Sequence, residues 1–231
     1  MRIAMWSGPR NLSTAMMYSF GARDDFAVMD EPFYAPYLAA TGLKHPMAAK
    51  IMAHHETDPE KVALSCGGEG SPHLYMKHMP HHMVAGFPMG WAEKCINLHL
   101  IRHPARVIAS YAAKREAPSL DDIGFAQQTR VYQQLGGIVI DSTDLRAQPE
   151  KMLREICKSI DIPFDYKMLR WKSGPRPEDG VWADHWYNAV HQSDGFAGAE
   201  GPLPVVPAAL QPVLDAALPH YEGLFCHRLS P

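Results

Sequence analysis

Short apolar runs alternate with longer stretches of helical spacing along most of the chain. Five of these runs have the length of buried strands, at residues 3–6, 26–29, 74–76, 98–101 and 137–140. Strands that alternate with helices are typical of a parallel sheet covered on both faces. The pattern therefore predicts a three-layer α/β domain with a central parallel sheet of about five strands.

Between these runs, apolar residues recur at helical spacing. The predicted helices cover residues 36–43, 47–55, 59–65, 120–135 and 148–160, together with the stretches that follow the first and fourth strands. The tail at 203–231 is rich in Pro, Ala and Leu, and it is predicted to form one terminal helix over Leu203 to Arg228. We expect the whole chain, residues 1–231, to form a single domain with this helical tail.

The stretch from Met5 to Phe20 carries the first chemical signal. An apolar strand stops at Ser7-Gly8-Pro9, and an apolar helical stripe begins after Thr14. A strand, a tight turn and a helix in this order aim free backbone N–H groups and the positive helix end at one point, which suits a phosphate or sulfate. Arg10 adds a cation, so residues 8–12, here called the anion loop, are predicted to bind an anion.

The anion loop differs from the loop that binds Mg-ATP. That loop reads GxxxxGK[ST], with a lysine on the terminal phosphates. Here Leu12 stands in the place of the second glycine and Ser13 in the place of the lysine. A kinase on the same fold is therefore disfavoured, but it stays open as an alternative.

A second anion element spans Asn97 to Lys114. Arg102 follows an apolar strand, Pro104 suits a first helical position, and Ser110 lies eight residues after Arg102. This pair resembles the 3′-phosphate-binding element of the PAPS-dependent sulfotransferases. The segment Pro9 to Thr14 is similar to that family's Pro-Lys/Arg-x-Gly-[ST]-T element. With both elements present, the chain resembles the bacterial-type sulfotransferases. That family has the P-loop fold.

The resemblance implies a function and a donor. The function is in-line transfer of a sulfuryl group from PAPS to a hydroxyl or amine of a small-molecule acceptor, leaving PAP. The residues implied to bind the donor are Arg10, Asn11, Leu12, Ser13 and Thr14 for the 5′-phosphosulfate, and Arg102, Ser110, Lys172 and Arg176 for the 3′-phosphate. Lys172 and Arg176 enter through their similarity to a basic, glycine-containing loop near the C-terminus of the family.

The catalytic residues implied are Arg10 and Lys77, which would stabilise negative charge, and a base. Glu31 follows the second strand, where ligands of parallel sheets bind, and it matches a glutamate base of several sulfotransferases. His78 is the rival base. It directly follows Lys77, whereas the family has one residue between them, and adjacent strand residues face opposite ways. Glu31 is therefore favoured, unless a turn begins at His78.

Metal, nucleic acid and membrane are not expected as partners. His78, His81 and His82 lie close together, but no further ligand stands at metal-binding spacing. The formal net charge is −3, and no apolar run approaches a membrane span. The four cysteines show no CxxC spacing and the first strand leaves no room for a signal peptide, so we expect a cytoplasmic protein with reduced thiols. A non-catalytic protein that binds PAP or another nucleotide stays open, because Leu12 could crowd a phosphate.

Overall fold

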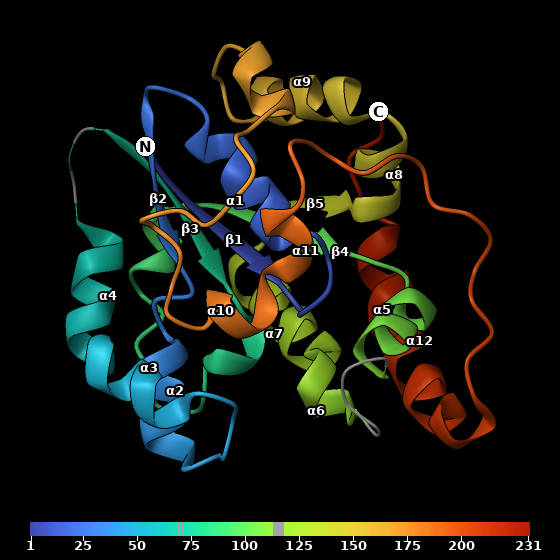
Figure 1. Ribbon diagram of the computed structural model, residues 1–231, viewed down its shortest axis with the longest axis horizontal. Coiled ribbons are helices and arrows are strands. Elements are labelled where there is room, and N and C mark those ends of the chain that lie inside the picture. The colour runs from blue at the N-terminus through green and yellow to red at the C-terminus, as the bar shows by residue number, and fades with distance from the viewer. Residues whose placement is uncertain (69, 71, 113–117) are drawn as a thin grey trace.

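Five parallel strands form the centre of the molecule, in the order β2-β3-β1-β4-β5 (Figure 1). The structure is a computed structural model that describes residues 1–68, 70, 72–112 and 118–231. The strands are β1 (Arg2–Ser7), β2 (Phe26–Asp30), β3 (His73–His78), β4 (Ile96–Ile101) and β5 (Ile138–Asp141). The predicted parallel sheet is confirmed, because each predicted apolar run lies within or overlaps one of these strands.

Helices cover both faces and the ends of this sheet. Those in the first half of the described chain are α1 (Ser13–Gly21), α2 (Tyr34–Thr41), α3 (Ala48–His54), α4 (Pro59–Gly67) and α5 (Pro104–Ala112). Those in the second half are α6 (Leu120–Ile123), α7 (Phe125–Leu135), α8 (Ser142–Ala147), α9 (Pro149–Ser159), α10 (Ala183–Trp186), α11 (Asn188–His191) and α12 (Gln211–Phe225). Short 3₁₀ turns lie at Pro80–His82, Ala92–Lys94, Tyr166–Leu169 and Ala208–Leu210.

The alternation of side chains along β1 divides the core into two layers. Ile3 and Met5 pack in one apolar cluster with α1 and α9, whereas Ala4 and Trp6 pack in another with α4. Successive side chains of a strand point to opposite faces. A strand that is apolar at every position is therefore one that is covered on both faces, as the sequence of β1 predicted.

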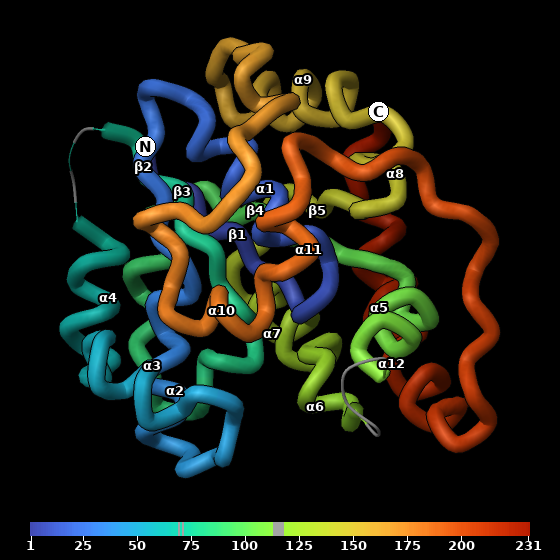
Figure 2. Tube along the Cα trace, in the orientation of Figure 1, coloured from blue at the N-terminus to red at the C-terminus, as the bar shows by residue number. Residues whose placement is uncertain are grey.

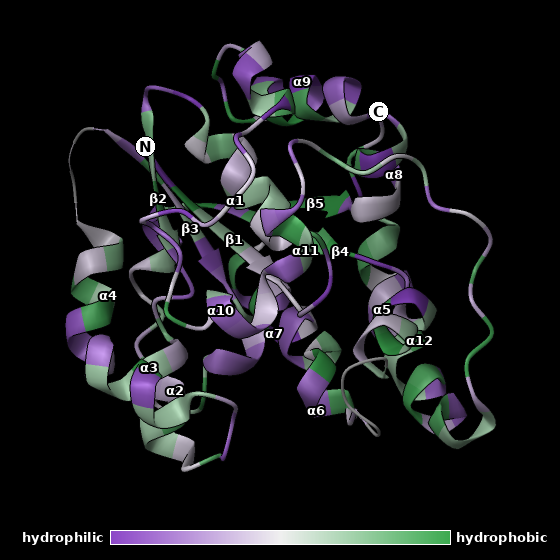
Figure 3. Ribbon diagram, in the orientation of Figure 1, coloured by the Kyte–Doolittle hydropathy of each residue, from purple (hydrophilic) through white to green (hydrophobic). Residues whose placement is uncertain are grey.

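The amphipathic helix α9 shows how the outer layer is built. Its residues Met152, Leu153, Ile156 and Cys157 are buried. Figure 3 shows its hydrophilic residues on the outer side and its hydrophobic residues toward the sheet. Pro149 occupies the first helical position, where its missing N–H costs no hydrogen bond.

Two predicted helices differ from the structure. The helix expected over residues 120–135 is broken at Gly124, whose φ of 70° ends α6 and starts α7. The tail is not one helix from Leu203, because residues 203–207 form neither helix nor strand and α12 begins only at Gln211. The second anion element, predicted over Asn97 to Lys114, ends at residues 113 and 114, which lie outside the described residues.

Helix α12 and the chain end are joined to the core. Tyr221 donates a hydrogen bond to Asp141 at the end of β5, over 2.8 Å. The backbone N–H of Leu229 donates to the carbonyl of Val139, also over 2.8 Å. The tail therefore closes the sheet on the β5 side.

Candidate active site

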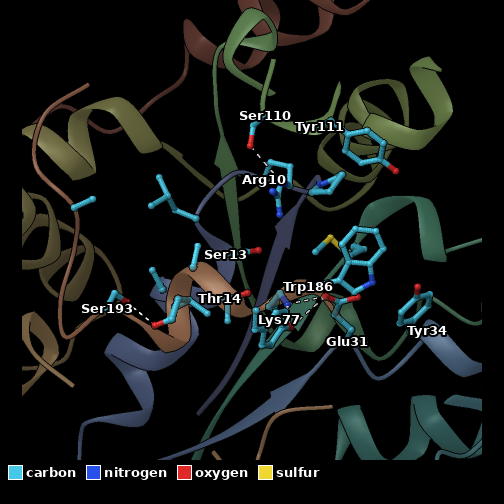
Figure 4. A pocket seen from close by; sticks show the side chains of 18 of the residues that line it. Arg10, Ser13, Thr14, Glu31, Tyr34, Lys77, Ser110, Tyr111, Trp186 and Ser193 are labelled. Atoms are coloured by element: carbon cyan, nitrogen blue, oxygen red, sulfur yellow. Dashed lines mark hydrogen bonds and ion pairs between the residues drawn. The ribbon is translucent and has the colours of Figure 1, made fainter. Parts of the chain in front are cut away.

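A cavity of about 560 Å³ opens at the carboxyl edge of the sheet, beside the ends of β1, β2 and β3. This is the edge where parallel sheets bind ligands. Figure 4 shows Arg10 and Ser110 on one side of the cavity, Lys77 and Glu31 on the other, and Ser13 and Thr14 between them. The two predicted chemical centres, the anion loop and the strand ends at Glu31 and Lys77, thus line one space.

The anion loop joins β1 to α1 by an unusual backbone path. Arg10 and Leu12 adopt left-handed conformations, with φ of 64° and 70°. Glycine takes this conformation without strain, which explains the glycine of the related motifs at the position of Leu12. The Leu12 side chain lines the cavity and also packs partly against the core cluster beneath α1.

The first turn of α1 faces the cavity through Ser13, Thr14 and Ala15. The first N–H groups of a helix have no partner within the helix. In the described part of the chain, no side chain caps the start of α1 at Leu12. This helix start therefore offers free N–H donors and a positive dipole end to an anion.

Polar side chains from distant parts of the chain hold the anion loop in place. The Gly8 N–H donates to Gln128 over 3.2 Å, and the Gln128 amide donates to the carbonyl of Trp6 over 3.0 Å. Asn11, predicted to bind the donor, is buried and donates to the carbonyl of Leu100 over 3.3 Å. It therefore supports the loop. Gln128 carries no sequence motif, and no signal in the sequence could have pointed to it.

Arg10 lies between the two residues of the second anion element. Its Nε donates to the Ser110 hydroxyl over 3.3 Å, and its carbonyl accepts a hydrogen bond from Arg102 Nη1 over 2.6 Å. Burial and the charge of Arg102 lower the pKa of Arg10. The structure thus joins the two predicted anion elements through Arg10. Ser110 lines the cavity, whereas the guanidinium of Arg102 also reaches Glu200 of a later loop.

Lys77 forms the centre of a buried charge cluster at the ends of β2 and β3. Its Nζ lies 2.9 Å from Asp30 Oδ1 and 2.6 Å from Glu31 Oε1. Lys77 also donates to the hydroxyl of Tyr187, which in turn donates to Asp30 over 2.7 Å. The side chains of Lys77 and Asp30 are each 1% exposed. One cation thus faces two carboxylates away from water.

This excess of negative charge changes the ionisation of the cluster. Burial, with the neighbouring charge of Asp30, raises the pKa of Glu31 although Lys77 opposes the rise. Burial acts to lower the pKa of Lys77, but the charges of Asp30 and Glu31 outweigh it and raise that pKa. A carboxylate with a raised pKa holds a proton more firmly, which suits a general base.

Glu31 also has a distinctive backbone. Its φ of 40° makes it a left-handed residue directly after β2. Its N–H donates to the carbonyl of Lys77 over 2.9 Å, and its carbonyl accepts from Tyr34. Strained backbone of this kind occurs often at functional sites, where the surrounding contacts hold it. Here it turns the carboxylate from the strand toward the cavity.

His78 lies on the opposite face of the sheet from Lys77. Its ring stacks on Trp6 with a centroid distance of 4.7 Å and lies 4.8 Å from Trp91. Burial lowers the pKa of His78 to about 3, and its ring nitrogens have no hydrogen-bond partner in the described chain. His78 belongs to the apolar layer beneath α4 and is not among the residues that line the cavity.

Aromatic and histidine side chains form the wall beyond Glu31. Tyr34 stacks on His82 with a centroid distance of 4.5 Å, and Trp186 closes the same side. His82 Nδ1 lies 3.9 Å from Glu31 Oε2, and burial keeps the pKa of His82 well below its usual value. A neutral His82 beside Tyr34 makes this part of the cavity largely apolar.

Lys172 and Arg176 do not reach the cavity. Arg176 packs its guanidinium on the ring of Tyr18, 3.9 Å from the ring centre, close to Gly21 at the far end of α1. Lys172 is exposed and does not line the cavity. Neither residue is thus among those that line the cavity, whereas Ser110 is.

The described chain shows neither a metal-binding group of side chains nor a membrane-spanning helix. No group of three or more His, Cys, Asp or Glu side chains in residues 1–68, 70, 72–112 and 118–231 could hold a metal ion. Over the same residues, none of the helices has the length and apolar character needed to span a membrane.

Comparison with known families gives a match over nearly the whole chain. A family profile described as a sulfotransferase domain matches residues 1–227. Two curated relatives come from Arabidopsis thaliana. Branched-chain-amino-acid aminotransferase-like protein 1 is 37% identical over 97% of this chain and 42% of its own length. Branched-chain-amino-acid aminotransferase-like protein 2 is 35% identical over 97% of this chain and 41% of its own length. The chain thus spans about two fifths of the length of these relatives.

Two solved structures share the fold. The sulfotransferase domain from the Synechococcus PCC 7002 olefin synthase has a TM-score of 0.55 at 20% identity, over 99% of this chain and 95% of that one. The sulfotransferase domain from the curacin biosynthetic pathway has a TM-score of 0.58 at 15% identity, over 100% of this chain and 98% of that one. At these identities the likeness shows the fold of the chain.

Proposed function

The chain belongs to the sulfotransferase domain family, and we propose that it moves a sulfuryl group from PAPS to a hydroxyl or amine of a small-molecule acceptor. One arrangement carries this proposal. The uncapped start of α1, Arg10 and the Lys77–Glu31 pair line the same cavity. An anion site and a candidate base therefore face each other across one cavity of about 560 Å³.

The anion side of the cavity would hold the donor. The free N–H groups of the first turn of α1, with the hydroxyls of Ser13 and Thr14, would bind the 5′-phosphosulfate. Arg10 would lie beside the oxygen that leaves the sulfur, where negative charge grows during transfer. Fixed donors aimed at developing charge are a large source of rate enhancement. The hydrogen bond from Arg10 to Ser110 holds the guanidinium for this role.

The opposite side of the cavity would activate the acceptor. The acceptor oxygen or nitrogen attacks sulfur, the bond from sulfur to the PAP oxygen breaks, and the acceptor proton passes to Glu31. Lys77 fixes one oxygen of Glu31, while Oε2 lies on the side of His82. The charges of Arg10 and Lys77 would serve where kinases use Mg²⁺. The apolar wall of Tyr34 and Trp186 would receive the body of the acceptor.

Transfer and binding are tested separately. Transfer is measured as PAP release from PAPS with a panel of hydroxyl and amine acceptors, in EDTA and in Mg²⁺. We expect acceptor-dependent release in both. Calorimetry with PAP and ADP tests recognition of the 3′-phosphate, and a lost charge-assisted contact corresponds to about tenfold or more in affinity.

The outcomes separate this proposal from its alternatives. PAP binding without transfer to any acceptor would favour a non-catalytic nucleotide-binding protein. Equal affinity for PAP and ADP, with binding only in Mg²⁺, would favour a kinase. Acceptor-dependent PAP release in EDTA fits neither alternative.

A further inference from the structure

Three arginines converge on one carboxylate beside the anion loop. Arg102 follows β4, Arg106 lies on α5 and Arg146 lies on α8. Arg102 is paired with Glu200, Arg106 Nε lies 3.0 Å from Glu200 Oε2, and Arg146 Nη1 lies 2.8 Å from Glu200 Oε1. The Glu200 side chain is 2% exposed. Arginines from three separate elements have thus been brought to a single anion site.

Glu200 comes from a long loop on the outside of the molecule. Figure 2 shows the chain between α11 and α12 running past α8 and α5. Residues 196–207 form no helix or strand, and the loop is tied down by side chains of the cluster. Arg146 Nε donates to the carbonyl of Gly198 over 2.8 Å, and Arg106 donates to the carbonyl of Gly201. Apart from the isolated β-bridge between Gly195 and Arg170, release of this loop would break no hydrogen bonds of a helix or strand in the described chain.

The carboxylate does not match the charge and donors of its partners. Three guanidinium groups carry three positive charges, and Glu200 supplies one negative charge and two oxygens. The buried Nε of Arg102 has no hydrogen-bond partner in the described chain. A phosphate monoester brings about −1.5 to −2 charges and three terminal oxygens, and arginine pairs with phosphate in a bidentate manner. Such a group would match this cluster better than Glu200 does.

The cluster is also connected to the cavity. Arg102 Nη1 donates to the carbonyl of Arg10 over 2.6 Å, so the cluster adjoins the anion loop. Gly195, Phe196 and Ala197, which precede Glu200 on the same loop, line the cavity. Displacement of Glu200 would therefore alter the positions of residues at both the donor side and the wall of the cavity.

The family resemblance implies a 3′-phosphate site at Arg102. We propose that Arg106 and Arg146 extend this site, and that Glu200 is its internal occupant, which the 3′-phosphate of the donor displaces. This inference rests on the proposed function. In the nucleotide-free protein, Glu200 holds the loop at 195–201 against the arginines. When the nucleotide binds, its 3′-phosphate pairs with the arginines in place of Glu200, and the loop is released. Burial acts to raise the pKa of Glu200, but the hydrogen bond from Arg102 and the arginine charges lower it, so that Glu200 is charged at neutral pH.

Calorimetry with PAP, AMP and inorganic phosphate tests the proposal on the full chain. The variants are Glu200→Gln, which keeps the shape and removes the charge, and Arg146→Ala, which removes one partner. Glu93→Gln is the matched control, because Glu93 is exposed on the turn before β4. We expect Glu200→Gln to bind PAP about 10-fold to 100-fold more tightly than the wild type, with AMP affinity unchanged. We expect Arg146→Ala to weaken PAP binding about 10-fold, with AMP again unchanged.

Hydrogen exchange of the wild type tests displacement without any variant. Saturating PAP should increase exchange at residues 195–201, and AMP should not. If Glu200→Gln is unstable, this measurement on the wild type still tests whether PAP displaces Glu200. PAP binding by the wild type with no change in exchange would overturn the displacement of Glu200 and leave the proposed function standing.

The remaining outcomes distinguish failure of this inference from failure of the proposed function. An unchanged PAP affinity in Glu200→Gln and Arg146→Ala would overturn the inference alone. A gain with inorganic phosphate equal to the gain with PAP would assign the cluster to free phosphate and overturn its link to the donor. A wild type and a Glu200→Gln variant that both fail to bind PAP would overturn the proposed function itself.

Discussion

Lys77 and His78 are adjacent on β3 and face opposite sides of the sheet. Lys77 binds Asp30 and Glu31 at the cavity, whereas His78 stacks on Trp6 in the apolar layer beneath α4. Successive strand residues alternate between faces, and β3 runs through both residues without a bulge in its register with β1. Of the two candidate bases, only Glu31 therefore lines the cavity.

Glu31→Gln is expected to lower turnover with PAPS by roughly 10²-fold to 10⁴-fold. The amide keeps the shape of the side chain but cannot take the acceptor proton. PAP affinity should stay near that of the wild type, because Glu31 lies across the cavity from the anion loop. Steady-state kinetics and PAP calorimetry measure the two effects.

His78→Phe is the matched control for this prediction. A phenyl ring can pack against Trp6 and Trp91 as the imidazole does, and His78 makes no hydrogen bond in the described chain that the change would break. Turnover per folded molecule should remain within a few-fold of the wild type, as for a residue outside the site. A normal Glu31→Gln enzyme beside an inactive His78→Phe would transfer the role to histidine.

The fold could be predicted because its signals are local. The apolar run of β1 and the turn at Ser7-Gly8-Pro9 are each visible within a few residues, and together they give the strand, loop and helix of the anion site. The errors in the fold also have local causes. Gly124 takes a left-handed conformation that the helical spacing of residues 120–135 does not reveal.

The site could be predicted only in part. The positions of Arg10, Glu31 and Lys77 follow from strand order and the shared carboxyl edge of a parallel sheet. Tyr187 and Glu200 do not, since they contact residues 156 and 98 positions away in sequence. No periodicity or motif marks a residue whose partner is brought to it only by the folded chain.

Lys77→Met is expected to destabilise the protein by about 3–5 kcal/mol. The change leaves the carboxylates of Asp30 and Glu31 buried without a cation, and their mutual repulsion adds to the cost of burial. Urea unfolding measures the loss. Adding Asp30→Asn and Glu31→Gln should restore most of it, because the uncompensated charges are then gone.

Lys50→Met is the control for this loss. Lys50 pairs with Asp184 on the surface, where the two side chains are 46% and 73% exposed. Exposed pairs contribute about 0–1 kcal/mol. A Lys77→Met protein as stable as Lys50→Met would show that the buried cluster carries no such charge imbalance.

Arg10→Ala is expected to lower turnover by about 10²-fold to 10³-fold, the usual effect of removing a donor aimed at developing charge. Ser110→Ala removes only the hydroxyl that holds Arg10, so its effect should stay below about tenfold. Arg130→Ala is the control, because Arg130 is exposed on α7. Steady-state kinetics with PAPS compare the three, and equal losses in all three would contradict the role of Arg10.

Buried neutral histidines predict that stability falls as the solution becomes acidic. Burial lowers the pKa of His78 to about 3 and that of His99 to about 4, both below the ordinary value of 6.5. The unfolded chain therefore binds protons first. Each group contributes stability that is present above pH 6.5 and is lost as pH falls toward its folded pKa, by up to about 1.4 kcal/mol per pH unit.

His78→Phe isolates one of these contributions, because the raised pKa of Glu31 acts on stability with the opposite sign. Urea unfolding of the wild type and the variant, measured from pH 7 to pH 5, gives the difference in stability at each pH. Since phenylalanine cannot bind the proton, the variant should lose less stability than the wild type as pH falls. The gap should grow by up to about 1.4 kcal/mol per pH unit below 6.5. A constant gap over this range would mean that His78 ionises alike in the folded and unfolded chains, and would contradict the effect expected from its burial against Trp6 and Trp91.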